Sequence, residues 1–80
     1  MRAILMAERT RGRPLPYLRA WRDKKLLTQD ELAEQSGVGR STIARAEKGD
    51  EAVNYTNIRK LATALGISPD ELLSAPTGGE

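Results

Sequence analysis

The chain has 80 residues, 39% of them hydrophobic, and its 13 Lys or Arg against 11 Asp or Glu give a formal net charge of +2. It contains no cysteine and no histidine, which excludes disulfides, the zinc sites that these residues build, and nucleophiles activated by a histidine base. We therefore expect one small domain that is not an enzyme and holds no metal or cofactor. No apolar run approaches the ~20 residues that span a bilayer, and the lack of cysteine fits a reducing cytoplasm.

Residues 1–15 are expected to form a basic N-terminal arm. Residues 1–25 carry eight Arg or Lys against two acidic residues, whereas the rest of the chain carries five basic and nine acidic residues. A glycine and two prolines in the sequence TRGRPLP discourage helix there. The arm either lies along DNA phosphates or the minor groove, or is a disordered tail. Its apolar residues 4–6 are expected to pack on the domain or on a second subunit.

The spacing of apolar residues predicts an all-α domain over residues 16–74, followed by a flexible tail over residues 75–80. In the first helix, which we expect to open at Pro16, Leu18 and Trp21 share one face and are expected in the core. The five predicted helices comprise residues 16–25, 29–36, 40–48, 55–65 and 69–73.

The predicted helix ends carry local signals in the sequence. Thr28 with Glu31, and Ser68 with Glu71, have the S/T-x-x-E spacing of a capping box, in which two side chains bond free amides at a helix start. Three helices are followed by a glycine, which adopts the left-handed conformation without a Cβ penalty. These glycines are Gly37, Gly49 and Gly66.

Residues 29–49 are predicted to form two short helices joined by a tight turn. The second helix buries Ile43 and Ala46, and its opposite face is turned outward at i, i+1, i+4, i+5 spacing. That outward face consists of Arg40, Ser41, Ala44 and Arg45. A short helix that presents two arginines and small side chains suits insertion into a DNA major groove.

This segment, with Leu27-Thr28-Gln29 before it, resembles the helix-turn-helix of phage-repressor and Cro-type regulators, the XRE type, and the likeness extends over residues 17–73. The resemblance implies a compact five-helix repressor-like domain that binds double-stranded DNA as a homodimer through its C-terminal helix. Helix 40–48 would enter the major groove of an inverted repeat whose half-sites lie about 10–10.5 base pairs apart. We therefore expect a sequence-specific transcriptional regulator, with repression as its expected role, in the cytoplasm of a bacterium or encoded by a phage.

The resemblance also implies which residues contact DNA. Bases would be contacted by Arg40, Ser41, Ala44 and Arg45, since arginine suits the O6 and N7 atoms of guanine and alanine a thymine methyl. Either arginine could instead hold a phosphate, and Ser41 could contact phosphate or sugar. Contacts with the DNA backbone are expected from Thr28, Gln29, Gly39, Thr42, Lys48, Asn54 and Asn57.

Glu47 falls on or near the inward side of helix 40–48, where an unpaired carboxylate is costly. The resemblance implies an ion pair with Arg22, and the alternative is a solvated glutamate. The chain departs from the family pattern at Leu26, where glycine commonly ends the first helix. It departs again at Asp50 and Glu51, where many relatives carry basic residues that face the DNA backbone.

Two alternatives to the regulator stay open. The chain could be an antitoxin that also binds a toxin protein, with residues 4–6 as the contact. It could also be a protein-interaction module that has lost DNA binding, because phosphates would repel Asp50 and Glu51.

Overall fold

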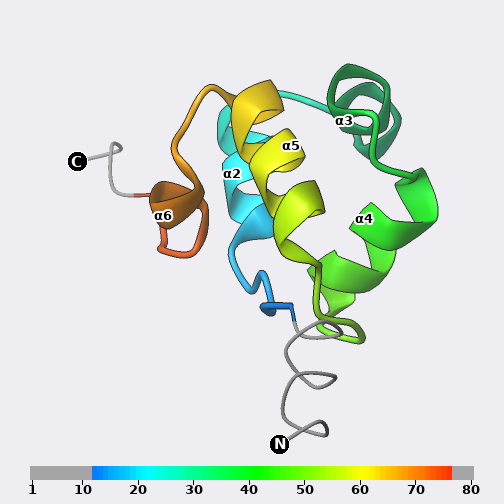
Figure 1. Ribbon diagram of the computed structural model, residues 1–80. Helices are drawn as coiled ribbons and strands as arrows, with labels where there is room; N and C mark the ends of the chain where they lie inside the picture. The colour runs from blue at the N-terminus through cyan, green and yellow to red at the C-terminus, as the bar shows by residue number, and fades with distance from the viewer. Residues whose placement is uncertain (1–11, 77–80) are drawn as a thin grey trace, which may run out of the picture.

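The computed structural model describes residues 12–76. These residues form five helices, which are labelled in Figure 1: α2 (Leu18–Lys24), α3 (Gln29–Ser36), α4 (Arg40–Lys48), α5 (Tyr55–Leu65) and α6 (Pro69–Leu72). Within residues 12–76 the chain forms no strand, apart from one isolated antiparallel bridge between Arg13 and Val53. The predicted all-α class is confirmed, and the bounds of α3, α4 and α5 agree with those predicted from the sequence.

Helix α5 runs through the middle of the molecule, with α6 on one side and α3 and α4 on the other (Figure 1). Its apolar face supplies a large share of the core, because Ile58, Leu61, Ala62 and Leu65 are all buried at the i, i+3, i+4, i+7 spacing of one helix face. The other buried residues are Leu15, Leu18, Trp21, Leu32, Val38, Ile43, Ala46, Val53 and Leu72. No helix in the described part of the chain is both long and apolar enough to cross a bilayer.

Local side-chain bonds define the helix starts. The Thr28 hydroxyl accepts from the Glu31 amide at 3.0 Å, and the Glu31 carboxylate accepts from the Thr28 amide at 2.9 Å. Ser68 and Glu71 form the same capping box at the start of α6. Both predicted boxes are confirmed, and they satisfy amides that have no partner inside the helix.

Helix α2 ends on a residue that is not glycine. Leu26 has a φ of 61° and is 88% exposed, and the amides of Leu26 and Leu27 bond back to the carbonyls of Asp23 and Arg22. This pair of bonds is the Schellman arrangement, which places a left-handed residue directly after the helix. Leu26 therefore adopts the conformation that glycine adopts at the ends of α3, α4 and α5.

The packed domain begins earlier in the chain than residue 16. Leu15, which the sequence analysis assigned to the arm, is only 1% exposed, and Arg13 exchanges two backbone hydrogen bonds of 2.9 Å with Val53. Gly12 lies so close to this strand-like contact that a Cβ would overlap the carbonyl oxygen of Val53. Helix α2 starts at Leu18 rather than Pro16, because the preceding residues form a turn closed by Leu18 N–H to Leu15 O at 3.2 Å.

Trp21 lies in the core, as expected, and ties the end of the domain to α2. It is 6% exposed, and its indole Nε1 donates to the carbonyl oxygen of Ser74 at 2.8 Å. The buried N–H is thereby satisfied, as buried indoles usually are. Residues 1–11, which include the apolar residues 4–6, and residues 77–80 lie outside the described part of the chain.

Candidate nucleic-acid interface

The turn between α3 and α4 determines the orientation of α4 relative to α3. Gly37 ends α3 with a φ of 79°, and its amide bonds to Ala33 O at 2.9 Å. Val38 then enters the core, and Gly39 precedes α4 in an extended conformation. With Ile43 and Ala46 buried, the opposite side of α4 faces solvent.

The four predicted base-contact residues lie on that opposite side of α4. Arg40, Ser41 and Arg45 are exposed, and Ala44 is partly buried. Their spacing within an observed helix brings them to one face. This face combines two guanidinium groups with two small side chains, which is a chemistry suited to base edges in a major groove.

Both arginines on this face are engaged by carboxylates of the protein. Arg40 Nε lies 3.1 Å from Asp30 Oδ1 of α3, and Arg45 Nε donates to Glu51 Oε1 at 2.6 Å. Neither contact was predicted from the sequence. The contact between Arg45 and Glu51 had a signal in the sequence. A glycine directly after α4, Gly49, predicts that the chain turns back there, and this turn can bring Glu51 close to Arg45.

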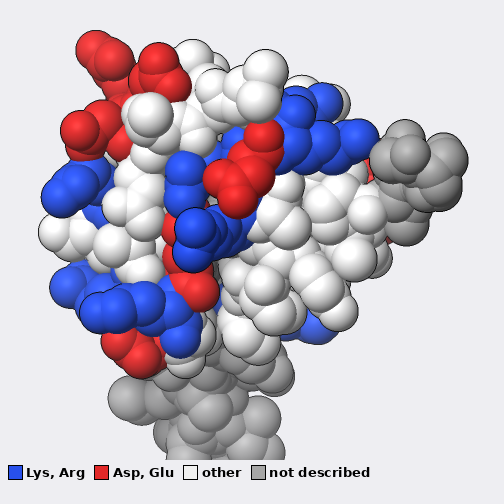
Figure 2. Space-filling view, turned by 180° about the vertical axis from the view of Figure 1, so that it is seen from behind, with Lys and Arg blue, Asp and Glu red and all other residues white. Residues whose placement is uncertain are grey.

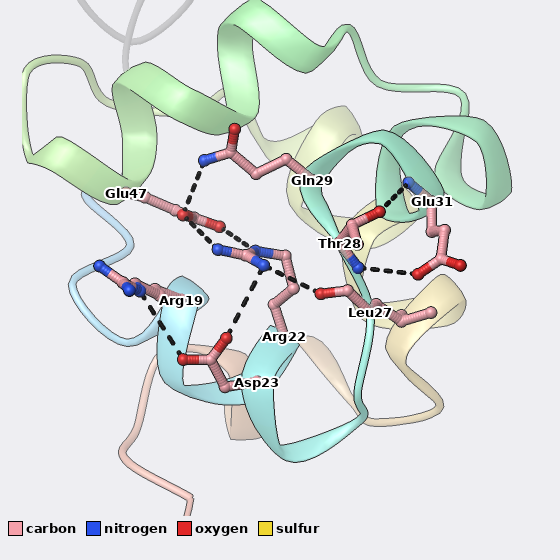
Figure 3. A network of polar contacts seen from close by, with 8 residues as sticks. All are labelled: Arg19, Arg22, Asp23, Leu27, Thr28, Gln29, Glu31 and Glu47. Carbon is pink, nitrogen blue, oxygen red and sulfur yellow. Dashed lines mark hydrogen bonds and ion pairs between the residues drawn. The ribbon is translucent and has the colours of Figure 1, made fainter.

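A network of polar side chains connects α2, α3 and α4 (Figure 3). Arg22 Nε donates to Glu47 Oε2 at 2.6 Å, and Arg22 Nη2 donates to Glu47 Oε1 at 3.0 Å. Gln29 Nε2 bonds to the same Oε1 at 3.0 Å, and Arg22 Nη1 donates to Leu27 O at 2.9 Å. The side chains of Arg22 and Glu47 are only 12% and 6% exposed. The structure thus brings together the two residues of the expected ion pair, and no buried polar side-chain atom of the described residues lacks a hydrogen-bond partner.

Burial and hydrogen bonding shift the pKa of Glu47 in opposite directions. Removal from water tends to raise the pKa of its carboxyl group, but the hydrogen bonds from Arg22 and Gln29 outweigh this effect, and the pKa lies below its ordinary value of 4.5. The hydrogen bond to Glu47 raises the pKa of Arg22 despite its partial burial. Both groups are therefore held in their charged forms.

Comparison with known proteins identifies this arrangement. Residues 18–72 match the family model described as Helix-turn-helix. The chain belongs to the helix-turn-helix family. This finding confirms the predicted family.

Two relatives and one solved structure extend the comparison. The chain is 36% identical over 59 residues to a protein from Neisseria meningitidis serogroup B called "Neisseria hypothetical transcription factor", covering 74% of this chain and 56% of that protein. It is 36% identical over 56 residues to control protein C.BamHI of Bacillus amyloliquefaciens, covering 70% of this chain and 69% of that protein. The structure of the restriction-modification controller protein C.AhdI from Aeromonas hydrophila matches with a TM-score of 0.68 and 47% identity, over 71% of this chain and 86% of that one.

In this helix-turn-helix protein, several of the residues expected to contact the DNA backbone already have partners. The Thr28 hydroxyl caps α3, and the Gln29 amide bonds to Glu47. The Asn54 side chain accepts a hydrogen bond from the backbone amide of Asn57 at 2.8 Å and caps α5. The other three residues of the set are Gly39 and Lys48, which are exposed, and Thr42, which is partly buried.

The charge around the helix-turn-helix is mixed. On the face shown in Figure 2, Lys and Arg side chains lie interspersed with Asp and Glu side chains, and they form no continuous basic surface. Nonspecific attraction to phosphates is therefore reduced by neighbouring carboxylates.

Proposed function

We propose that this chain is a sequence-specific DNA-binding transcriptional regulator and that it acts as the controller protein of a restriction–modification system. The observation that carries the DNA-binding role is the outward face of α4, on which Arg40 and Arg45 of the helix-turn-helix are exposed. The controller role is supported by the 47% identity to C.AhdI, across 86% of that chain, and by the similarity to C.BamHI. Since the named relatives are bacterial, the proposed site of action is a bacterial cytoplasm.

In the proposed complex, α4 enters the major groove and its arginines contact guanines. Ser41 and Ala44 lie between them on the same face, where a hydroxyl and a methyl group can contact neighbouring base edges or the sugar–phosphate backbone. Gln29 has a second amide hydrogen besides the one that bonds to Glu47, and this hydrogen remains available for a phosphate oxygen. The N-terminus of α3 adds free backbone amides at the same place.

We further propose that the protein binds as a homodimer on an inverted repeat and represses transcription. Half-exposed Tyr55 and partly buried Leu73 line a shallow depression between α5 and α6, together with Ile58. Such a partly apolar surface at the C-terminal end of the domain can pack against a second copy. A two-fold dimer would place its two α4 helices on half-sites about one helical turn apart.

The test is selection of bound fragments from a random duplex pool at near-physiological salt, followed by sequencing. An enriched inverted repeat supports a specific dimeric reader, and a single half-site argues against the dimer. Absence of any enriched sequence overturns the proposed function. Arg40→Ala and Arg45→Ala should each relax the consensus, by about 1–3 kcal/mol of discrimination for a lost base contact. Lys60→Ala, at an exposed residue of α5 that does not line the proposed dimer surface, is the control and should leave the consensus unchanged.

A transcription assay with the selected site tests the regulatory role. The site is placed over a promoter, and the level of the transcript is measured as protein is added. A fall in transcript supports repression, whereas a rise contradicts it and indicates activation.

A further inference from the structure

We propose that Glu51 is a positioning residue that increases sequence specificity by holding Arg45 in a guanine-reading orientation. The proposal rests on the proposed function and assigns a role to an acidic residue that would otherwise only weaken DNA binding. It predicts that Glu51 lowers the affinity for nonspecific DNA and raises the preference for the correct site.

The geometry of the contact leaves the reading edge of Arg45 open. The hydrogen bond of 2.6 Å joins Glu51 Oε1 to Nε of the guanidinium group. The end of the group formed by Nη1 and Nη2 points away from Nε in the same plane. Those two atoms can together donate to guanine O6 and N7 in a bidentate contact.

The backbone that carries Glu51 is held on both sides. On the N-terminal side, Gly49 is left-handed with a φ of 83°, and the Asp50 amide bonds back to Arg45 O at 3.0 Å. On the C-terminal side, Val53 is buried and exchanges two hydrogen bonds with Arg13. A carboxylate on so constrained a segment can orient a long side chain, because its own position is determined by the fold.

Stability alone does not account for this pair. The side chains of Arg45 and Glu51 are 53% and 41% exposed, and ion pairs with this exposure contribute little to folding. A free arginine loses much of its rotamer freedom when it contacts a base, and prior ordering reduces that loss. We therefore expect the ion pair to increase the affinity of Arg45 for its base and to contribute little to the stability of the fold.

Asp50 provides a matched control for charge. It is the neighbouring residue, it is exposed, and it forms no ion pair with any residue in the described part of the chain. Asp50→Ala and Glu51→Ala each remove one negative charge from the same loop. Repulsion of phosphates depends on charge and distance and is the same for every DNA sequence, so both variants should bind nonspecific DNA more tightly.

The experiment measures the Kd of each variant for the selected site and for sites in which single guanines are replaced. The specificity ratio is the Kd for the altered site divided by the Kd for the selected site. Glu51→Ala should lower this ratio about 2- to 10-fold at the guanine that Arg45 contacts, the effect expected from losing the order of one long side chain. Asp50→Ala should leave the ratio unchanged. In an Arg45→Ala background, which removes the reading group, Glu51→Ala should no longer affect the ratio.

The possible failures are distinguishable. If wild-type protein prefers a site but Glu51→Ala and Asp50→Ala change the ratio alike, Glu51 acts through charge alone and the inference is wrong. It is also wrong if Arg45→Ala leaves the ratio unchanged, or if Glu51→Ala lowers the ratio in the Arg45→Ala background. If wild-type protein prefers no sequence, the proposed function fails and this inference fails with it.

Discussion

Arg22 and Glu47 are 25 positions apart in the chain, and two hydrogen bonds of 2.6 and 3.0 Å join the guanidinium group of the first to the carboxylate of the second. The pair ties α2 to α4, the helix that presents the candidate base contacts. Gln29 and the carbonyl of Leu27 complete the bonding of both groups. The orientation of α4 is therefore determined by a bonded network as well as by apolar packing.

Removing one partner of this pair should destabilise the fold. Glu47→Ala should reduce the free energy of unfolding by about 3 kcal/mol, because it leaves the Arg22 guanidinium largely buried without its counter-ion. Urea unfolding can be followed by the fluorescence of the single tryptophan of the chain, Trp21. The double variant Arg22→Met/Glu47→Leu should recover much of the loss, because an apolar pair carries no desolvation penalty. A loss below about 1 kcal/mol for Glu47→Ala would show that the pair behaves as a surface contact.

The pair should also make stability depend on pH in the acid range. The pKa of Glu47 is lower in the folded protein than its ordinary value of 4.5, so the unfolded state takes up a proton first as the pH falls. The stabilisation is complete above about pH 4.5 and is lost as the pH falls through the folded pKa. Glu47→Gln should flatten this part of the stability profile, measured by urea unfolding between about pH 6 and 2. Asp50→Asn, at an exposed acidic residue, is the control and should keep the slope.

Leu26→Gly should stabilise the protein. The φ of 61° at Leu26 costs an ordinary residue about 1–2 kcal/mol, and glycine avoids this cost but loses about 0.5–1 kcal/mol through its greater freedom in the unfolded chain. We expect a net gain of roughly 0.5–1 kcal/mol from these two effects, measured by thermal or urea unfolding. Leu26→Ala is the control, since it removes the exposed side chain and retains the strained backbone. Equal effects of the two substitutions would assign the gain to the side chain.

The residues before α2 should matter for stability. Leu15→Ala should cost about 2–5 kcal/mol, as expected for a fully buried leucine. Gly12→Ala should also destabilise, because the new methyl group would overlap the backbone at Val53; we expect about 1–3 kcal/mol, as for other overpacked sites. Pro14→Ala, at an exposed neighbour, should change stability little. Neutral effects at both Gly12 and Leu15 would mean that this segment does not pack on the domain.

Short-range signals account for what was predictable from the sequence. The capping boxes at Thr28 and Ser68 join residues three positions apart, and the left-handed glycines after α3, α4 and α5 concern one backbone angle each. Such features depend on neighbours along the chain. They predicted the bounds of α3, α4 and α5, and the spacing of apolar residues predicted the outward face of α4.

The amino-acid sequence by itself determined the order of the helices, their buried faces and the ends of α3, α4 and α5, because periodicity and capping act over a few residues. The tertiary structure decided that Leu15 joins the core, that Arg13 bonds to Val53, and that Asp30 and Glu51 hold the two arginines of α4. These contacts depend on where a turn directs the chain and on which side chains then meet across space. Hydrophobic periodicity does not predict such contacts, since it indicates which face of a helix is buried and not which residues lie opposite that face.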